Sequence, residues 1–395
     1  MMTDRYRRSW LRALFLLPIL LLMTIVSCSD DAEEEPKLNI YVYAPEQASV
    51  TRSEILPTKE EAPIYNLQIW VFRSSNPTKK VATLTLTNEA ELKELNENGS
   101  AAYSIKLEDR SFAENPEPVD IYVLANVLNN NGTNYFTSIN NGADIERAVF
   151  DGGHFFSYLK GPAYQATTTI PEGKGIPLSG VARGKSVVDR NNVLHVNDAN
   201  LKLTRTISKI RFVFSSLEGL NQDGKPLNVF IGDIKLNRNM LYKKERFFLD
   251  GGHPSYWVEE SPFDEPALMS LGDRVNPIIK NEDPVAYAYS SAMSDGDYET
   301  LINKGIEEGK LTEFGPVYLP ESDKRLSGTI TFWLGSTGPL EADFSMATGN
   351  FHRNQTWVVY AYYIGSSKLV VNTVSVVKWD DIGDLMDHDY DIPNW

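Results

Sequence analysis

Apolar and polar residues alternate along most of the chain from Lys37 onward. The run Val81-Ala82-Thr83-Leu84-Thr85-Leu86-Thr87 shows this two-residue period cleanly, and it is rich in the β-branched residues that strands favour. Asn, Gly and Pro residues separate such runs. The pattern therefore predicts many short strands, which is typical of an all-β sandwich. Strands are expected at residues 38–43, 64–72, 81–87, 119–127, 201–214, 227–236, 326–334, 356–364 and 368–379.

Breaks in this pattern indicate how the chain is divided. Residues 173–200 are polar and rich in turn-forming residues, so we expect a domain boundary near residue 190, with domains at 37–190 and 191–395. Residues from about 250 to 313 are rich in Gly and Pro, which predicts a loop-rich insertion. A weak helical pattern is confined to residues 89–98 and 141–150.

The N-terminus is basic and then apolar. Residues 1–12 carry four arginines, and residues 13–26 are almost purely apolar but shorter than the ~18–20 residues of a membrane-spanning helix. The run ends at Ile25-Val26-Ser27-Cys28, which resembles the lipobox of bacterial lipoproteins. We expect a signal peptide at 1–27, cleavage between Ser27 and Cys28, and lipidation of Cys28, palmitate included. The alternative is an uncleaved signal anchor with an incidental cysteine.

Charge and cysteine content limit the classes of partner and site. Residues 28–36 form an acidic tether, which is either a plain spacer or similar to the surface-export signal of Bacteroidales lipoproteins. The net charge is −15, and it becomes −18 without the leader, which holds four arginines and one aspartate. Such acidity disfavours nucleic acid as a partner. Cys28 is the only cysteine, so the chain can form no internal disulfide.

Residue patterns that would indicate catalysis or metal binding are absent from the sequence. The five histidines, His154, His195, His253, His352 and His388, lie far apart and in no metal-binding spacing. No phosphate loop, dinucleotide fingerprint or nucleophile elbow occurs. Residues 294–299 faintly suggest a calcium loop, but their spacing fits a plain acidic turn better. We therefore expect no catalytic residue, no metal, no cofactor and no enzymatic activity.

Several stretches, read together, resemble the Bacteroidales-type fimbrillin family of FimA-like and Mfa-like pilus subunits. Their order and spacing across nearly the whole mature chain, together with the lipobox, carry the resemblance. The family implies two transthyretin-like antiparallel β-sandwich domains in tandem, lipoprotein export and assembly into surface fimbriae. The stretches are residues 64–72, Ile176-Pro177-Leu178-Ser179-Gly180, Leu203-Thr204-Arg205-Thr206-Ile207-Ser208-Lys209-Ile210, Val317-Tyr318-Leu319-Pro320-Glu321, Phe351-His352-Arg353-Asn354 and Val374-Ser375-Val376-Val377-Lys378-Trp379.

The resemblance also implies a mode of assembly. In shaft subunits of this family, a protease cuts after a basic residue, the first strand leaves, and a strand of the next subunit fills the groove. Arg52 and Ser53 are the candidate cleavage site here, and Leu38, Ile40 and Val42 mark the candidate displaced strand. The alternative is an ordinary first strand and an ordinary surface arginine. Residues 368–379 could be a resident or a donor strand, and the acidic tail at 380–395 departs from the family pattern.

Three hypotheses for function follow. The first is a fimbrial subunit lipoprotein that assembles by β-strand exchange and mediates adhesion; its partners would be other fimbrial subunits, the outer membrane through the lipid on Cys28, and a host or bacterial surface ligand. The second is a non-polymerising anchor or tip fimbrillin that keeps its first strand. The third is a surface glycan-binding lipoprotein using Tyr256, Trp257 or Trp333. The expected location is the cell outer membrane, surface-exposed, within a fimbrium.

Overall fold

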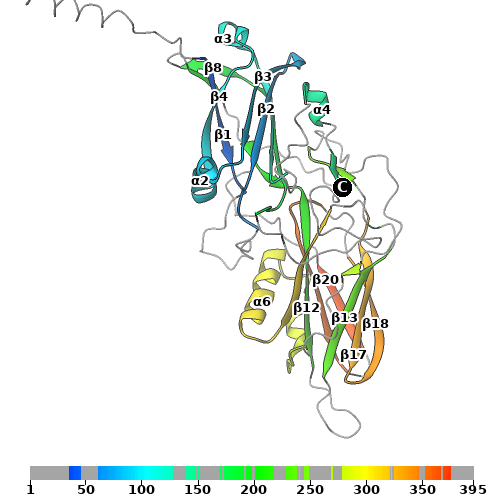
Figure 1. Ribbon diagram of the computed structural model, residues 1–395. Helices are drawn as coiled ribbons and strands as arrows, with labels where there is room; N and C mark the ends of the chain where they lie inside the picture. The colour runs from blue at the N-terminus through cyan, green and yellow to red at the C-terminus, as the bar shows by residue number, and fades with distance from the viewer. Residues whose placement is uncertain are drawn as a thin grey trace, which may run out of the picture.

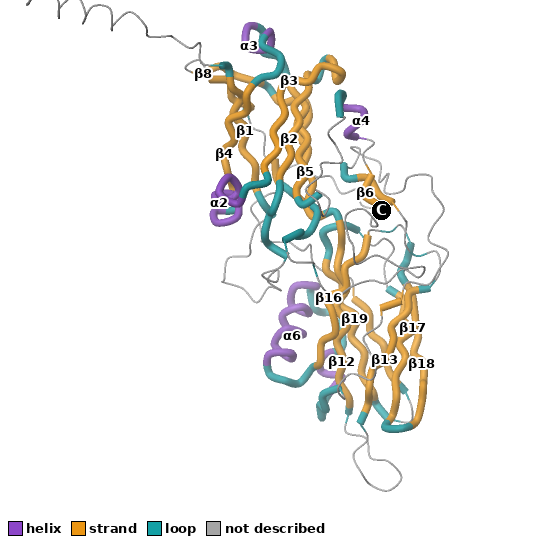
Figure 2. The backbone as a smooth tube through the Cα atoms, viewed as in Figure 1, coloured by secondary structure: helices purple, strands orange, loops and turns teal. Residues whose placement is uncertain are grey.

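Two stacked pairs of β-sheets make up most of the molecule, and they lie end to end (Figures 1 and 2). The computed structural model describes residues 35–45, 61–127, 139–146, 149–151, 170, 173–190, 193–197, 201–217, 228–237, 240, 244–248, 268–269, 278–320, 322, 324–346, 352–365 and 368–374.

The first sandwich packs two five-stranded sheets face to face. Its core contains the inward residues of both sheets, for example Ile40 of β1 and Val71 of β2, each fully buried. Sheet 1 holds β4 (Ser100–Lys106), β1 (Lys37–Tyr43), β10 (Leu201–Lys202), β9 (Val193–Val196) and β8 (Val187–Arg190). Sheet 2 has the order β11 (Thr204–Arg205), β7 (Leu178–Lys185), β5 (Val119–Ala125), β2 (Leu67–Arg73) and β3 (Asn76–Leu86).

Helix α2 (Glu89–Asn98) connects β3 to β4 and lies at one end of this sandwich (Figure 1). The Asn88 side chain accepts a hydrogen bond from the Ala90 amide at its start, as N-cap residues do. Gly99 ends the helix in the left-handed conformation, with φ +70°, which glycine adopts without strain. Leu92 and Leu95 are buried in the core. The helix expected at 89–98 is confirmed, and two shorter ones follow, α3 (Ser111–Glu114) and α4 (Gly142–Glu146).

The second sandwich packs two four-stranded sheets. Edge-to-face aromatic pairs fill its core, with ring centroids 5.8 Å apart for Phe212 and Phe344 and 5.4 Å apart for Phe214 and Phe314. Sheet 3 has the order β16 (Thr312–Pro320), β12 (Ile207–Ser216), β19 (Thr356–Tyr363) and β20 (Leu369–Val374). Sheet 4 has the order β15 (Leu268–Met269), β13 (Val229–Leu236), β17 (Ser327–Leu334) and β18 (Thr337–Ser345).

Helix α6 (Asp295–Glu307) lies beside sheet 3, next to the short 3-10 helix η2 (Pro284–Tyr287) (Figure 1). Its Tyr298 and Ile302 are buried against Tyr360 of β19. The expectation of a loop-rich insertion through residue 313 is therefore wrong for residues 295–307. The acidic run read as a turn is a helix start, because the Ser294 hydroxyl caps the Asp297 amide at 3.2 Å.

The two sandwiches are joined by more than the chain connection. The ribbon of β6 (Val149–Asp151) and β14 (Lys244–Arg246) pairs segments from the two halves of the sequence. Phe247, which follows β14, lies in a cluster with Trp70 and Tyr122 on the outer face of sheet 2. The Phe247 carbonyl accepts hydrogen bonds from Ser179 at 2.8 Å and from Arg353 at 2.7 Å.

The expected all-β class with two tandem sandwiches is confirmed. The structure adds three parallel pairings, β1 with β9, β1 with β10 and β12 with β19. Sheet membership changes between Arg205 and Ile207, so β9, β10 and β11, which follow residue 190, pair with the first sandwich. Residues 250–267 and the tail at 380–395 lie outside the described residues.

Candidate assembly site at the first strand

Strand β1 occupies a central position in sheet 1. It pairs antiparallel with β4 along its whole length, from Lys37 opposite Lys106 to Tyr43 opposite Ser100. On its other side it pairs in parallel with β9 near its start and with β10 near its end. Among the described strands, β4 has β1 as its only named partner. Removing β1 would therefore leave two backbone edges facing one empty strand position.

The side chains of β1 alternate between the core and solvent. Leu38, Ile40 and Val42 are each fully buried and face sheet 2. Tyr41 and Tyr43 point the other way and are 50% and 38% exposed. This alternation is what the sequence pattern predicts for a strand with one buried face. The candidate displaced strand is thus an inserted core strand of the first sandwich.

Backbone hydrogen bonds continue past both ends of β1. The Leu107 amide donates to the Pro36 carbonyl at 3.1 Å, and the Ala44 amide donates to the Gly99 carbonyl at 2.9 Å. Before the strand, Glu35 forms an ion pair with Lys106 at 2.6 Å, and this hydrogen bond lowers the pKa of the Glu35 carboxyl. That pair is exposed, so it adds little to stability. The buried side chains and the backbone pairing hold the strand in place.

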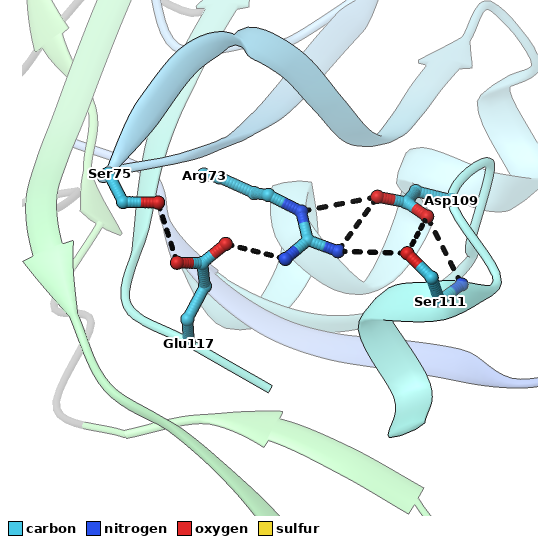
Figure 3. Close-up of polar contacts among 5 residues, drawn as sticks. All are labelled: Arg73, Ser75, Asp109, Ser111 and Glu117. Carbon is cyan, nitrogen blue, oxygen red and sulfur yellow. Dashed lines mark hydrogen bonds and ion pairs between the residues drawn. The ribbon is translucent and has the colours of Figure 1, made fainter. Parts of the chain in front are cut away.

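A cluster of polar residues fixes the loop that follows β4 (Figure 3). Arg73, the last residue of β2, donates to Asp109 from Nη2 at 2.8 Å and to Glu117 from Nη1 at 2.5 Å. Its guanidinium also lies 5.0 Å from the ring centroid of Phe112. Ser75 donates to Glu117 at 2.6 Å, and Ser111 donates to Asp109 at 2.6 Å.

Hydrogen bonds within this Arg73 cluster lower the pKa values of both of its carboxyls. Hydrogen bonds from Ser111 and then Arg73 lower the pKa of Asp109, and hydrogen bonds from Ser75 and then Arg73 lower the pKa of Glu117. The carboxylates in turn raise the pKa of Arg73. The cluster links the end of β2 to the segment after β4 and to the segment before β5. It therefore holds the β4 side of the β1 position to sheet 2 independently of β1 itself.

The sequence-predicted site residues fall into two groups. Leu38, Ile40 and Val42 lie together on β1, whereas Ser27, Cys28, Arg52 and Ser53 lie outside the described residues, as do Tyr256 and Trp257. Trp333 is half-buried on β17, and its ring packs against Gly232. The contact is so close that a Cβ added at Gly232 would lie 2.1 Å from the ring. Residues 369–374 of the candidate donor strand form β20, which pairs with β19.

Over the described ranges, no group of three or more His, Cys, Asp or Glu side chains is arranged to hold a metal ion. None of the described helices is both long and apolar enough to cross a membrane.

Sequence reasoning missed the Arg73 cluster. Its members are spread from residue 73 to residue 117, and no local spacing marks them. An arginine at the end of an apolar strand is the only signal, and that is equally typical of a solvated strand end.

Comparisons with known proteins show similarity of fold. No family model matches the chain, and no curated protein matches it. The structure is similar to that of a candidate cell adhesion protein from Parabacteroides distasonis, with 14% identity and a TM-score of 0.50 over 87% of this chain and 98% of the other. Two further solved structures are similar. The tip fimbrial protein Mfa3 of Porphyromonas gingivalis has 14% identity and a TM-score of 0.48, over 86% of this chain and 98% of the other. A candidate cell adhesion protein of Bacteroides eggerthii has 14% identity and a TM-score of 0.49, over 88% of this chain and 96% of the other.

Proposed function

We propose that this protein is a fimbrial subunit lipoprotein of the bacterial outer surface, which assembles by β-strand exchange and mediates adhesion rather than catalysis. In this proposal residues 1–27 are removed, Cys28 carries the lipid, and residues 28–36 form a tether. The two sandwiches then act as N-terminal and C-terminal domains, and other fimbrial subunits and the outer membrane are the partners. The similarity of fold to a candidate cell adhesion protein is consistent with this role.

The placement of β1 is the observation that carries the proposal. The strand is inserted between β4 on one side and β9 and β10 on the other, and it contributes three fully buried aliphatic side chains. Each such side chain contributes about 1.5–3 kcal/mol by burial. A chain that lost β1 would expose this apolar groove and two unpaired backbone edges. A strand of a neighbouring subunit with the same alternation would satisfy both.

The position of Arg52 suits release of β1. The strand ends at Tyr43, and the described chain resumes at Glu61, which is fixed at the junction of the sandwiches. A cut between Arg52 and Ser53 lies between these two fixed points. It would free the lipid on Cys28 and β1 together, while residues from Glu61 onward keep their contacts.

An Arg-specific protease provides the test. Purified precursor is incubated with the protease, and the products are analysed by N-terminal mass spectrometry and size-exclusion chromatography. We expect a new N-terminus at Ser53, followed by polymers. The matched control is Arg52→Gln, which should stay intact and monomeric under the same conditions. An intact Arg52, or a cut product that never polymerises, would contradict shaft assembly.

A non-polymerising anchor or tip subunit is the second candidate. In such a subunit the seven-residue register of β1 with β4 and its pairing to β9 and β10 persist in the mature protein. In that case the lipid on Cys28 remains and holds the protein to the outer membrane. Intact lipidated chains at one end of isolated fimbriae would support this version.

A surface glycan-binding lipoprotein is the remaining candidate. Two exposed tyrosines on β1, Tyr41 and Tyr43, add to the aromatic residues Tyr256, Trp257 and Trp333 that the sequence suggests as sugar platforms. Binding on a glycan array that is lost in Trp257→Ala would favour this class. Binding that no aromatic substitution changes would count against it.

A further inference from the structure

The core-facing side chains of β1 become smaller from the start of the strand to its end. Leu38 and Ile40 are followed by the smaller Val42 and then by Ala44, which comes just after the strand. The first three are fully buried, and Ala44 is 7% exposed and packs in the same core. Protein cores are packed about as densely as organic crystals, so each of these four inward positions has room for little more than its own side chain. The groove that holds β1 is therefore wide where the strand begins and narrow where it ends.

Backbone pairing does not select the direction of a strand in this groove. Strand β1 runs antiparallel to β4 on one side and parallel to β9 and β10 on the other. A strand inserted in the reverse direction would again have one antiparallel and one parallel side, so both directions offer similar hydrogen bonding. A shift by two residues would also keep the same face buried, since the side-chain period of a strand is two. The sizes of the inward side chains must therefore specify both direction and register.

A charged contact marks the wide end of the groove. Glu35 has one carboxylate oxygen 2.6 Å from Nζ of Lys106 and the other 3.5 Å from Nη2 of Arg110. Both basic side chains are mostly exposed, so the ion pairs add little to affinity. Their charge still favours a strand that carries a carboxylate at this point, because electrostatic complementarity acts on the approach and register of a partner.

We propose that the β1 position is a size-graded groove that accepts the strand of a partner in one direction and one register only. Its role rests on the proposed assembly by strand exchange, in which the groove selects the incoming strand. At four alternating positions that strand carries two bulky aliphatic side chains, then one the size of valine and one the size of alanine. A carboxylate precedes the first of them by three residues, as Glu35 precedes Leu38. A neighbouring subunit, whether a copy of this chain or a related one, has to present this pattern to replace β1.

A reversed or shifted strand would fit the groove poorly. Reversal puts a leucine at the Ala44 position and an alanine at the Leu38 position; the first overfills a packed site and the second leaves a cavity. A shift by two residues toward the narrow end puts a valine at the Ala44 position and an isoleucine at the Val42 position, so it overfills both. From the cost of such core changes, a reversed strand should bind at least about a hundredfold more weakly than one in the order of β1.

Variants of the uncleaved full chain test the size grading without any cleavage. Ala44→Leu overfills the narrow end, and Leu38→Ala/Ala44→Leu reverses the two ends of the strand at constant composition. We expect both to lower the urea midpoint of the first sandwich, and the double variant to lower it further than Leu38→Ala alone. The matched control Lys37→Tyr/Tyr43→Lys exchanges the two exposed end residues of the same strand and should leave the midpoint nearly unchanged.

Two results would overturn the size grading. One is a midpoint for Ala44→Leu equal to or above that of the wild type, which would show free space at the narrow end. The other is a double variant more stable than Leu38→Ala, since a leucine would then be accepted at either end. If the double variant does not fold, Ala44→Leu by itself decides the question.

Peptide exchange in the cleaved protein tests the partner strand. The chain cut after Arg52 is incubated with an excess of fluorescent peptides of residues 35–45, and incorporation is measured by size-exclusion chromatography. The native peptide should replace β1, whereas a peptide with its four inward residues in reverse order should bind at least about a hundredfold more weakly. A Glu35→Lys peptide should associate severalfold more slowly at low salt, and this difference should vanish at high salt.

The peptide results distinguish the size grading from strand exchange itself. Equal incorporation of the native and the reversed peptide would leave strand exchange standing and overturn the size grading. Incorporation of neither peptide would contradict strand exchange, and with it the role of the groove in selecting a partner. Association of the Glu35→Lys peptide at the native rate would overturn the role given to Lys106 and Arg110.

Discussion

Truncation of one buried side chain on β1 tests how the candidate assembly site is held together. In the Ile40→Ala variant, the uncleaved chain keeps every backbone pair of β1 with β4, β9 and β10. It loses only side-chain atoms that are fully buried between sheets 1 and 2. The perturbation therefore isolates the apolar contribution of the strand from its hydrogen bonds.

The expected magnitude follows from the burial. Ile40 is fully buried, and the substitution removes three carbons at ~0.8 kcal/mol each. Incomplete collapse of the cavity adds to this, so we expect a loss of about 3–4 kcal/mol in the free energy of unfolding of the first sandwich. That is a large share of the ~5–15 kcal/mol by which domains are stable.

Urea denaturation of the uncleaved protein measures the effect. We expect a lower midpoint with an unchanged slope for the transition of the first sandwich, since the surface exposed on unfolding stays the same. Tyr41→Ala is the matched control, because Tyr41 is the neighbouring residue on the same strand and is half exposed. It should change stability by no more than about 0.5 kcal/mol. Equal effects of the two substitutions would refute the placement of Ile40 in the core.

Three more predictions test other parts of the structure. Arg73→Met should lower the midpoint of thermal unfolding at pH 7, because it leaves Asp109 and Glu117 without their shared partner. Folding lowers the pKa of both carboxyls, so their stabilising effect is present above pH ~4 and fades as the pH falls through the lowered pKa values. The unfolding midpoints of wild type and variant should therefore converge in acid. Gly328→Ala should destabilise the second sandwich strongly, since the added Cβ would lie 2.0 Å from the Lys235 carbonyl oxygen. The control Gly296→Ala places its Cβ in open space on α6, so it should leave stability unchanged or raise it by about 0.5–1 kcal/mol in the same denaturation assay. Ser294→Ala should cost about 1 kcal/mol through loss of the α6 cap, and circular dichroism that shows no change in stability would contradict the assignment of that cap.

The period of apolar residues predicted correctly the elements that have one buried face and one face exposed to solvent. Strand β1 has one buried and one exposed face, and its alternation in sequence is its alternation in burial. Helix α2 was predicted at its observed bounds from a weak helical pattern alone, and the structure adds the two residues that end it, Asn88 and Gly99.

Strand β12 shows why burial on both faces of a strand could not be predicted from the sequence. Lys209 and Arg211 alternate with apolar residues and so indicate a solvent-exposed face, yet all ten residues of the strand are buried. The Lys209 side chain meets Glu61 of the first sandwich, and Arg211 contacts Asn303 of α6 at 3.0 Å and Glu313 of β16. These partners lie more than ninety residues away in sequence, and local pattern holds no information about them.

Whether two strands pair in parallel or antiparallel could not be predicted from the sequence either. A two-residue period fixes which residues share a face, but it is the same for a parallel and an antiparallel neighbour. The parallel pairing of β1 with β9 and β10 arises from the return of the chain after β7 and so depends on the whole topology. Helix α6 was missed for a different reason, because Ser294 with Asp297 fits both an acidic turn and a capped helix start.

The central claim is that β1 is exchanged between subunits during assembly, and the mature N-terminus tests it most directly. Fimbriae are sheared from native cells, and the N-terminus of this protein within them is determined by mass spectrometry. The account predicts chains that begin at Ser53 and lack both the lipid and residues 38–43. Polymers in which every chain still begins at a lipidated Cys28 and retains β1 would contradict it.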